Sequence, residues 1–275
     1  MTARRSGTRR SAGPRVGRAP LHLVLPALAA VAFLVVPLAA LVARTPLVGL
    51  PHRVTDPIVL DALWLSLWTA TAAMLISLAV GLPLAWLLAR VDLPGRRLLR
   101  TLVTVPLVLP PVVAGVALLT AFGRTGVVGA PLRDFGVTIP FTATAVVLAH
   151  TFVALPFLVV SVEGALRATS REYDEVAAVL GASRSRTFFR VTVPMAAPGI
   201  AAGLVLGWAR SLGEFGATIT FAGSFPGVTQ TMPLAVYAAL QSDPDAALVL
   251  SLVMLAVSVA VLALLRERWF GRVVP

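Results

Sequence analysis

The sequence predicts an all-α, polytopic membrane protein with about six transmembrane helices. Of its 275 residues, 58% are hydrophobic and only 13% are charged, and the mean hydropathy is +0.91. Charged residues make up about one quarter of an average soluble protein. Several apolar runs also reach the roughly 18 residues that cross a bilayer as a helix. A soluble protein with a large core does not need runs of this length, so we expect a membrane protein.

Six apolar spans are expected, and short hydrophilic segments separate them. No linker is long enough to divide the chain, so residues 21–275 are expected to form a single transmembrane domain. The first run is too long for the core of a signal peptide, which predicts that it is retained. Residues 1–20 are polar and hold six arginines, as expected of a disordered basic tail. The predicted spans are residues 21–43, 59–89, 98–122, 142–166, 195–219 and 246–266.

The distribution of arginine predicts the topology, because basic residues accumulate in cytoplasmic loops. All 23 basic residues are arginine. If the N-terminus lies inside, 18 of them fall in inside segments, four in outside segments, and Arg210 lies within a span. Both termini are therefore expected to be cytoplasmic, with residues 90–97 and 167–194 inside and residues 44–58 and 220–245 outside. The net charge of +11 is read as a sign of topology, and no nucleic-acid partner is expected.

The longest inside loop, residues 167–194, has the pattern of two short helices. The first is expected over residues 172–180, with acids in its first turn and Ser170 as its N-cap. Gly181 is expected to end it with a positive φ. A second short helix should follow, and Pro194 should close the loop. Such a pair makes a projection that fits a groove on another protein, and the alternative is an interfacial helix on lipid.

The stretch EVAAVLGASRSRTFFRVTVPMAAPGI, residues 175–200, resembles the EAA loop of ABC importer permeases. Val176 stands where the family pattern has its first alanine. The resemblance implies a permease domain running from roughly the second span to the C-terminus, in which this loop is the coupling helix that docks into an ATPase subunit. The residues that it assigns to coupling are Glu175, Ala177, Ala178, Gly181, Ala182 and Phe188.

A second stretch, ARSLGEFGATITFAGSFPGVTQTMPLAVY at residues 209–237, resembles the molybdate branch of that family, with sulfate permeases as near relatives. This resemblance implies an oxyanion importer in the plasma (inner) membrane. It implies molybdate as the substrate, with tungstate, sulfate or thiosulfate as alternatives. The implied assembly is a homodimer of this chain with two ATPases, which bind the ATP and Mg, and an extracytoplasmic oxyanion-binding protein. This chain itself is expected to bind no cofactor or metal.

Arg210 and Glu214 lie one helical turn apart within the fifth predicted span. Ionisable groups in a span are costly and usually face a cavity or a partner. They either neutralise each other as an i,i+4 pair or mark the translocation path, and the sequence leaves both readings open. His150 is read as a packed polar residue. The candidates for the path or gate are Arg210, Ser211, Gly213, Glu214, Phe215, Gly216 and Thr218.

Other classes of function fit the sequence less well. There is no G-x-x-x-x-G-K-[ST] loop and no lysine, so the chain is not expected to hydrolyse ATP alone. The absence of cysteine excludes disulfides and thiol nucleophiles. An intramembrane enzyme would need an acid pair or a Ser/His motif within the spans, and the sequence has no H-E-x-x-H or G-x-S-x-G pattern. An ion-coupled secondary transporter, the remaining alternative, would usually show an internal repeat, and no convincing similarity joins the two halves.

Overall fold

The computed structural model describes residues 21–46 and 50–270, and every regular element in these ranges is a helix. The tail predicted for residues 1–20 lies outside the described residues. By their contacts the described elements form two compact units, one ending at Arg44 and one beginning at Thr45, and each is described by itself. Five described helices are long and apolar enough to span a membrane, or six if one bent pair counts as a single span. The predicted fold class is confirmed.

The first unit contributes helix α1, Leu21–Arg44. Its 24 residues correspond to about 36 Å of helix, enough to cross a hydrocarbon core of about 30 Å. Pro26 and Pro37 lie within the helix without ending it. This helix matches the first predicted span.

The second unit is built around three helices that pack on one another: α3 (Pro57–Arg90), α7 (Ala143–Ala168) and α10 (Val193–Leu212). Asp56 starts α3, because its carboxylate accepts a hydrogen bond from the Ile58 amide at 2.9 Å. Glycines let the helices approach closely: a Cβ added at Gly203 would lie 3.0 Å from the Cα of Leu158. Small residues on α10 therefore set how tightly the core packs.

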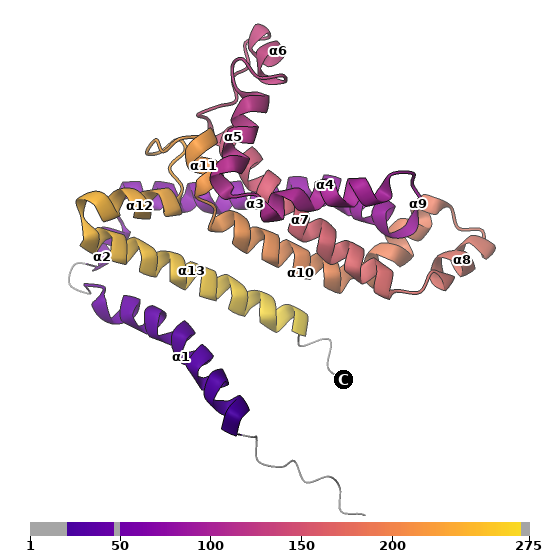
Figure 1. Cartoon of the computed structure of the whole chain (residues 1–275), viewed down its shortest axis with the longest axis horizontal. Coiled ribbons are helices and arrows are strands. Elements are labelled where there is room, and N and C mark those ends of the chain that lie inside the picture. The colour runs from indigo at the N-terminus through magenta and orange to yellow at the C-terminus, as the bar shows by residue number, and fades with distance from the viewer. Residues whose placement is uncertain (1–20, 47–49, 271–275) are drawn as a thin grey trace, which may run out of the picture. The chain divides into compact units, whose positions relative to one another are not determined.

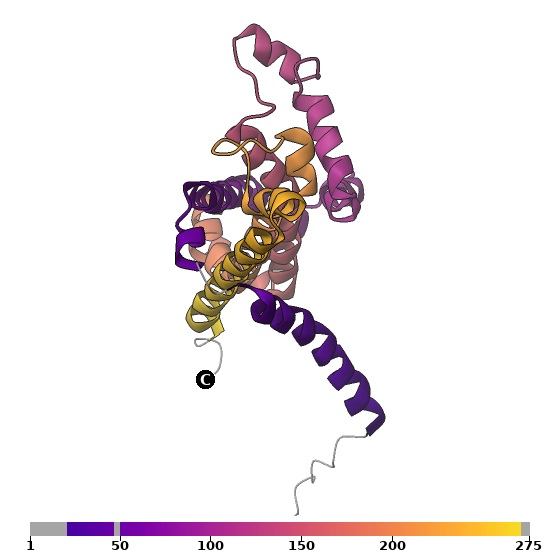
Figure 2. The same cartoon turned by 90° about the vertical axis from the view of Figure 1, so that its left-hand side faces the viewer.

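Helices α4 (Arg96–Val108) and α5 (Pro111–Phe122) correct one expectation. Residues 98–122 were predicted to form one span, but the two helices are bent by 118° at their junction. Leu109 and Pro110 are extended, with ψ of 132° and 134°. A residue before proline disfavours the helical conformation and proline lacks an amide donor, so two consecutive prolines end α4. Figures 1 and 2 show α5 and the short helix α6 (Gly129–Asp134) extending away from the packed long helices.

The fifth span also differs from its prediction. It was expected over residues 195–219, but the continuous helical run is Arg184–Leu212. The run comprises α9 (Arg184–Thr187), a π-helical turn η1 (Phe188–Thr192) and α10. Pro194 lies in the first turn of α10 instead of closing the loop, where its missing amide donor is tolerated. The second predicted loop helix is thus the start of the span itself.

The remaining elements lie at the two ends of the long helices (Figure 1). Helices α2 (Leu50–Val54) and α12 (Met232–Ser242) lie at one end, and α8 (Glu172–Val179) and α9 lie at the other. Helix α13, Pro244–Phe270, packs on α12 and supplies the last span. Helix α12 and the short helix α11 (Gly216–Phe221) were not expected from the sequence.

Candidate functional site

Helix α8 forms as predicted, and its end is defined by backbone geometry. Gly181 has a φ of 78°. The Gly181 amide donates to the Ala178 carbonyl at 3.0 Å, and the Ala182 amide donates to the Ala177 carbonyl at 2.9 Å. This pair of bonds is a Schellman motif, which favours glycine at the left-handed position. At the other end, the N-cap residue is Arg171 and not the expected Ser170, but the Ser170 hydroxyl still accepts from the Glu172 amide at 3.2 Å.

Asp174 ties α8 to the membrane helices. Its Oδ2 lies 3.3 Å from Nε of Arg90, the last residue of α3, whose side chain is only 8% exposed. Its Oδ1 accepts a hydrogen bond from the Thr192 hydroxyl at 3.0 Å. Arg90 Nη1 also donates to the Thr169 carbonyl at 3.2 Å. One carboxylate therefore connects α8 to α3 and to the start of the fifth span.

The predicted coupling residues divide between two surfaces. Glu175, Ala178, Ala182 and Phe188 line a cavity of about 470 Å³ between α8, α9 and the end of α3. The Phe188 ring packs edge-on against Trp86 of α3, with 5.8 Å between centroids. Four of the predicted residues therefore line the side of the loop toward α3, where Glu175 and Ala178 remain exposed.

The outward side of α8 carries exposed apolar side chains that the sequence analysis did not select: Tyr173, Val176, Val179 and Leu180. Tyr173, Val176 and Leu180 recur at helical spacing and share one face. Gly181 beside them is exposed, and Ala177 is half-buried. Val176, the departure from the family pattern, lies on this outward face. An i, i+3, i+7 apolar pattern in a loop helix was the signal that could have identified it.

The second candidate site is the break between α10 and α11, directly after the fifth span. Helix α10 ends at Leu212, and α11 begins at Gly216. Glu214 is 1% exposed, and its Oε2 lies 2.5 Å from Arg210 Nη1. Its Oε1 accepts from the Ala217 amide at 2.8 Å, so the same carboxylate caps the first turn of α11. The pair expected at i,i+4 is present, and it stabilises the break.

Helices α11 and α5, which lie beside the two breaks, pack on each other through glycines. A Cβ added at Gly216 would lie 2.6 Å from Pro111 Cβ, and one added at Gly115 would lie 2.8 Å from the Ala217 carbonyl oxygen. Helix α11 therefore lies against α5. Thr218 of α11 is fully buried, and its hydroxyl has no hydrogen-bond partner among the described residues. Gly216 and Thr218 were among the residues predicted from the sequence, whereas the α5 side of the contact was not predicted.

An apolar groove of about 430 Å³ begins at the same break. Gly213 and Phe215 line it together with α12 and α13, and the Phe215 ring contacts Tyr237 with centroids 5.1 Å apart. Ser211 points the other way, and its hydroxyl lies 3.5 Å from the carbonyl of His150. His150 is 1% exposed, as expected of a packed residue. The predicted path residues thus surround one break but do not form one cavity.

Broken membrane helices are tolerated only where protein or a water-filled path covers their backbone, and they are typical of transport proteins. Together with the short helix α8 beyond the ends of the spans, they define a membrane transport component. The chain belongs to the family of binding-protein-dependent transport system inner membrane components, whose model matches residues 81–275. It is therefore a multi-pass protein of the plasma membrane and a transport permease subunit, not itself an enzyme.

Similar proteins agree with this family. The Mycobacterium tuberculosis molybdenum transport system permease protein ModB is 48% identical over 242 residues, covering 88% of this chain and 92% of that protein. ModB of Escherichia coli K12 is 42% identical over 80% of this chain and 96% of its own length. The sulfate transport system permease protein CysT of E. coli is 37% identical, covering 76% of each chain.

Solved structures show the same fold. A bacterial ABC transporter involved in import of the acidic polysaccharide alginate contains a chain with a TM-score of 0.73 and 19% identity, covering 92% of this chain and 95% of that one. A chain of the MetNI methionine ABC transporter has a TM-score of 0.62, with 17% identity, and covers 78% of this chain and 95% of its own.

Proposed function

We propose that this chain is the pore subunit of an ATP-driven importer that moves molybdate across the plasma membrane. The observation that carries the proposal is the 48% identity with a molybdenum permease over 88% of the chain. That match includes both candidate sites, the loop around α8 and the break between α10 and α11. A sulfate permease is the second candidate, because CysT is 37% identical over 76% of this chain.

A separate ATPase subunit supplies the energy in this proposal, and α8 is its docking element. The exposed apolar face of Tyr173, Val176 and Leu180 supports docking, because apolar side chains on a helix in an aqueous loop are suited to a partner's groove. The tie from Asp174 to Arg90 supports transmission, since a movement of α8 would pull on α3. ATP and Mg bind the ATPase, and an extracytoplasmic oxyanion-binding protein delivers the substrate at the opposite end.

The proposed assembly is a homodimer of this chain with two ATPases, with both termini and α8 in the cytoplasm. The arginine distribution supports this orientation. The chain has no cysteine, so a single Ser185→Cys substitution reports directly on the topology. We expect an impermeant thiol reagent added outside the cell to leave this cysteine unlabelled. Labelling from outside would show that the chain has the opposite orientation in the membrane.

Substrate passage is proposed to run past the two broken helices. The segments beside these breaks carry backbone groups and hydroxyls, and weak polar contacts with them can pass an oxyanion without holding it. The supporting geometry is the docking of α11 on α5 beside the buried hydroxyl of Thr218. Arg210 is engaged with Glu214, so it does not act as a free cationic site in this conformation.

Complementation tests the substrate. The chain is expressed with the ATPase and binding protein of its own organism in a bacterium that lacks its molybdate permease. We expect molybdoenzyme activity to return at limiting molybdate and excess sulfate to have little effect. A strain that instead gains growth on limiting sulfate, without recovery of molybdoenzyme activity, would assign the chain to the sulfate branch.

A further inference from the structure

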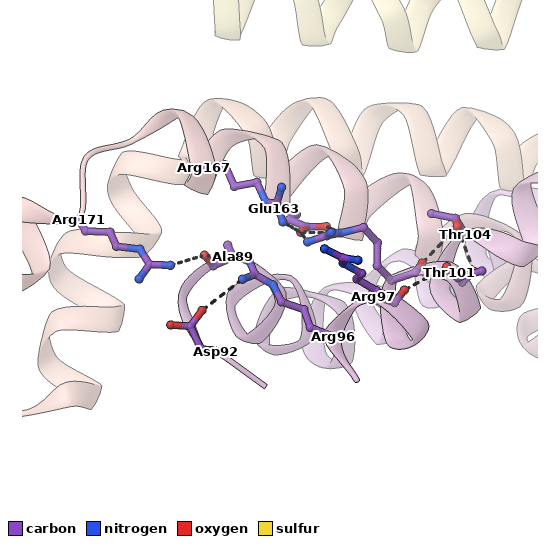
Figure 3. A network of polar contacts seen from close by, with 10 residues as sticks. Ala89, Asp92, Arg96, Arg97, Thr101, Thr104, Glu163, Arg167 and Arg171 are labelled. Carbon is purple, nitrogen blue, oxygen red and sulfur yellow. Dashed lines mark hydrogen bonds and ion pairs between the residues drawn. The ribbon is translucent and has the colours of Figure 1, made fainter. Parts of the chain in front are cut away.

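A cavity at the base of α8 is lined by four arginines and no acid. It holds about 560 Å³ and lies where the ends of α3 and α7 meet the start of α4. Figure 3 shows Arg96, Arg167 and Arg171 around an open space next to Ala89. The lining residues are Ala89, Arg90, Arg96, Arg167, Thr169, Ser170 and Arg171.

The guanidinium groups are held in place mainly by backbone oxygens and by acids outside the lining. Arg171 Nη2 and Arg96 Nη2 donate to the same carbonyl, that of Ala89, at 3.4 and 3.5 Å. Arg167 lies 2.9 Å from Glu163. These long or shared contacts leave several N–H donors unused. Among them, Nε of Arg96 is buried and has no hydrogen-bond partner within the described ranges.

The surrounding charge is not balanced. Glu163 is shared between Arg167 and Arg100, which lies 2.6 Å from its Oε1. The other ion pairs here join Arg96 to Asp92 and Arg90 to Asp174. Three acids thus pair with four of six arginines, and within the described part of the chain neither Arg97 nor Arg171 forms an ion pair, although Glu172 and Glu175 follow Arg171 on α8. The arginines are Arg90, Arg96, Arg97, Arg100, Arg167 and Arg171.

We propose that this arginine pocket binds a tetrahedral oxyanion. Arginine forks match the oxygens of phosphate-like groups and form charge-assisted hydrogen bonds with them. The Ser170 hydroxyl accepts from the Glu172 amide, which leaves its own proton free to donate to a ligand. The ligand is either the phosphate of an anionic phospholipid headgroup or a free oxyanion in the aqueous phase. The pocket lies at the end of the spans, where both sources are within reach.

An oxyanion in this pocket would bridge three elements. Arg96 belongs to α4, Arg167 to α7, and Arg171 directly precedes α8. A ligand that contacts all three would hold the base of α8 against the membrane helices. This effect on coupling rests on the proposed function, whereas binding itself does not, so the test measures binding and can fail independently.

The test uses the full chain, purified in nanodiscs. In the first arm the lipid is phosphatidylcholine, and radiolabelled sulfate, inorganic phosphate and molybdate are titrated at low ionic strength. In the second arm the lipid is a mixture of phosphatidylcholine and phosphatidylglycerol, and native mass spectrometry counts the phosphatidylglycerol that is retained. Binding in the first arm identifies a free oxyanion, and selective retention in the second identifies a lipid headgroup.

Three variants assign the binding to the pocket. We expect Arg171→Gln to weaken binding at least about tenfold, since one charge-assisted contact is lost, and Arg171→Lys to retain part of it. Arg186→Gln is the matched control, because Arg186 is exposed on α9 outside the pocket lining. Arg96→Gln gives a second reading if Arg171→Gln melts at a lower temperature. No binding by the unmodified chain in either arm, or an equal loss in Arg186→Gln, would overturn the proposal.

Discussion

The carboxylate of Asp174 on α8 joins the guanidinium of Arg90 at the end of α3, with 3.3 Å between Oδ2 and Nε. The two residues belong to helices far apart in the chain, and the same carboxylate also accepts from Thr192 near the start of the fifth span. Helix α8 is therefore fixed to two membrane helices at one point. In the proposed transporter, a movement of the ATPase is transmitted to the membrane helices through this contact of Asp174.

Removing the contact between Asp174 and Arg90 should uncouple the ATPase from transport. We expect Asp174→Asn to cost about 1–3 kcal/mol of local stability, because a largely buried arginine loses its ion-pair partner. Transport and the ATPase activity stimulated by loaded binding protein should both fall, while insertion into the membrane is retained. Asp134→Asn is the control, since its pair with Arg133 is exposed. Normal coupling in Asp174→Asn would show that the ion pair between Asp174 and Arg90 does not transmit movement from α8 to α3.

The positive φ of Gly181 gives a second prediction. Gly181→Ala should cost about 1 kcal/mol or more, because a Cβ is disfavoured in the left-handed region. Gly164→Ala is a matched control: an added Cβ would meet nothing within 4 Å at either position, and only Gly181 has a positive φ. Stimulated ATPase activity should fall in the first variant and not in the second. We expect the bulkier Gly181→Val, and Ala177→Arg beside it, to insert normally but lose coupled transport.

The outward face of α8 should bind the ATPase. Leu180→Glu places a charge on an apolar surface, so we expect the ATPase to be lost when the chain is purified through an affinity tag. Val127→Glu alters an equally exposed apolar side chain in the segment between α5 and α6, and it should keep the ATPase. Co-purification of the ATPase with both variants would show that the docking site does not include this face of α8.

The contact between α11 and α5 should tolerate no added methyl group at its centre. Gly216→Ala puts a Cβ 2.6 Å from Pro111 Cβ, and overpacking of this kind costs about 1–3 kcal/mol. We expect a lower melting temperature and reduced transport. Gly213→Ala is the control, because its nearest neighbour would be the Ala209 carbonyl at 3.7 Å. Equal melting temperatures for the two variants would contradict the close packing of the two breaks.

A double-mutant cycle can test whether Arg210 and Glu214 only neutralise each other or contact the substrate. Each single variant, Arg210→Gln or Glu214→Gln, leaves one charge unpaired inside a span, which is costly. We expect each to reduce transport strongly and the double variant to recover to within a few-fold of the unmodified chain, because the pair neutralises itself. A double variant as inactive as the singles would instead place one of these charges on the substrate path.

The long spans were predictable because continuous apolar runs fix their length and position. The span predicted at residues 59–89 is the helix Pro57–Arg90 in the structure, and the span predicted at residues 142–166 is the helix Ala143–Ala168. The loop helix was also predictable, since Ser170 and Gly181 are local signals for its two ends. Apolar periodicity and capping act within a few residues, so the sequence carries them directly.

The breaks were not predictable in the same way. Pro110 and Pro111 were visible, but prolines such as Pro83 and Pro156 remain inside straight runs. The two prolines end α4, but they do not set the 118° angle at which α5 leaves or its contact with α11, about one hundred residues later in the chain. The tie between Arg90 and Asp174 is also non-local. Helical spacing indicates which residues share a face, but it does not indicate which distant residue they meet.

ATP-driven uptake of radiolabelled molybdate into proteoliposomes, containing this chain, the ATPase and the binding protein, tests the proposed function most directly. We predict uptake only when ATP is present on the side of the membrane that carries α8 and loaded binding protein is present on the other side. Leu180→Glu should abolish this uptake, and Val127→Glu should not. Uptake that proceeds without the ATPase, or that follows an imposed ion gradient in the absence of ATP, would contradict an ATP-driven permease.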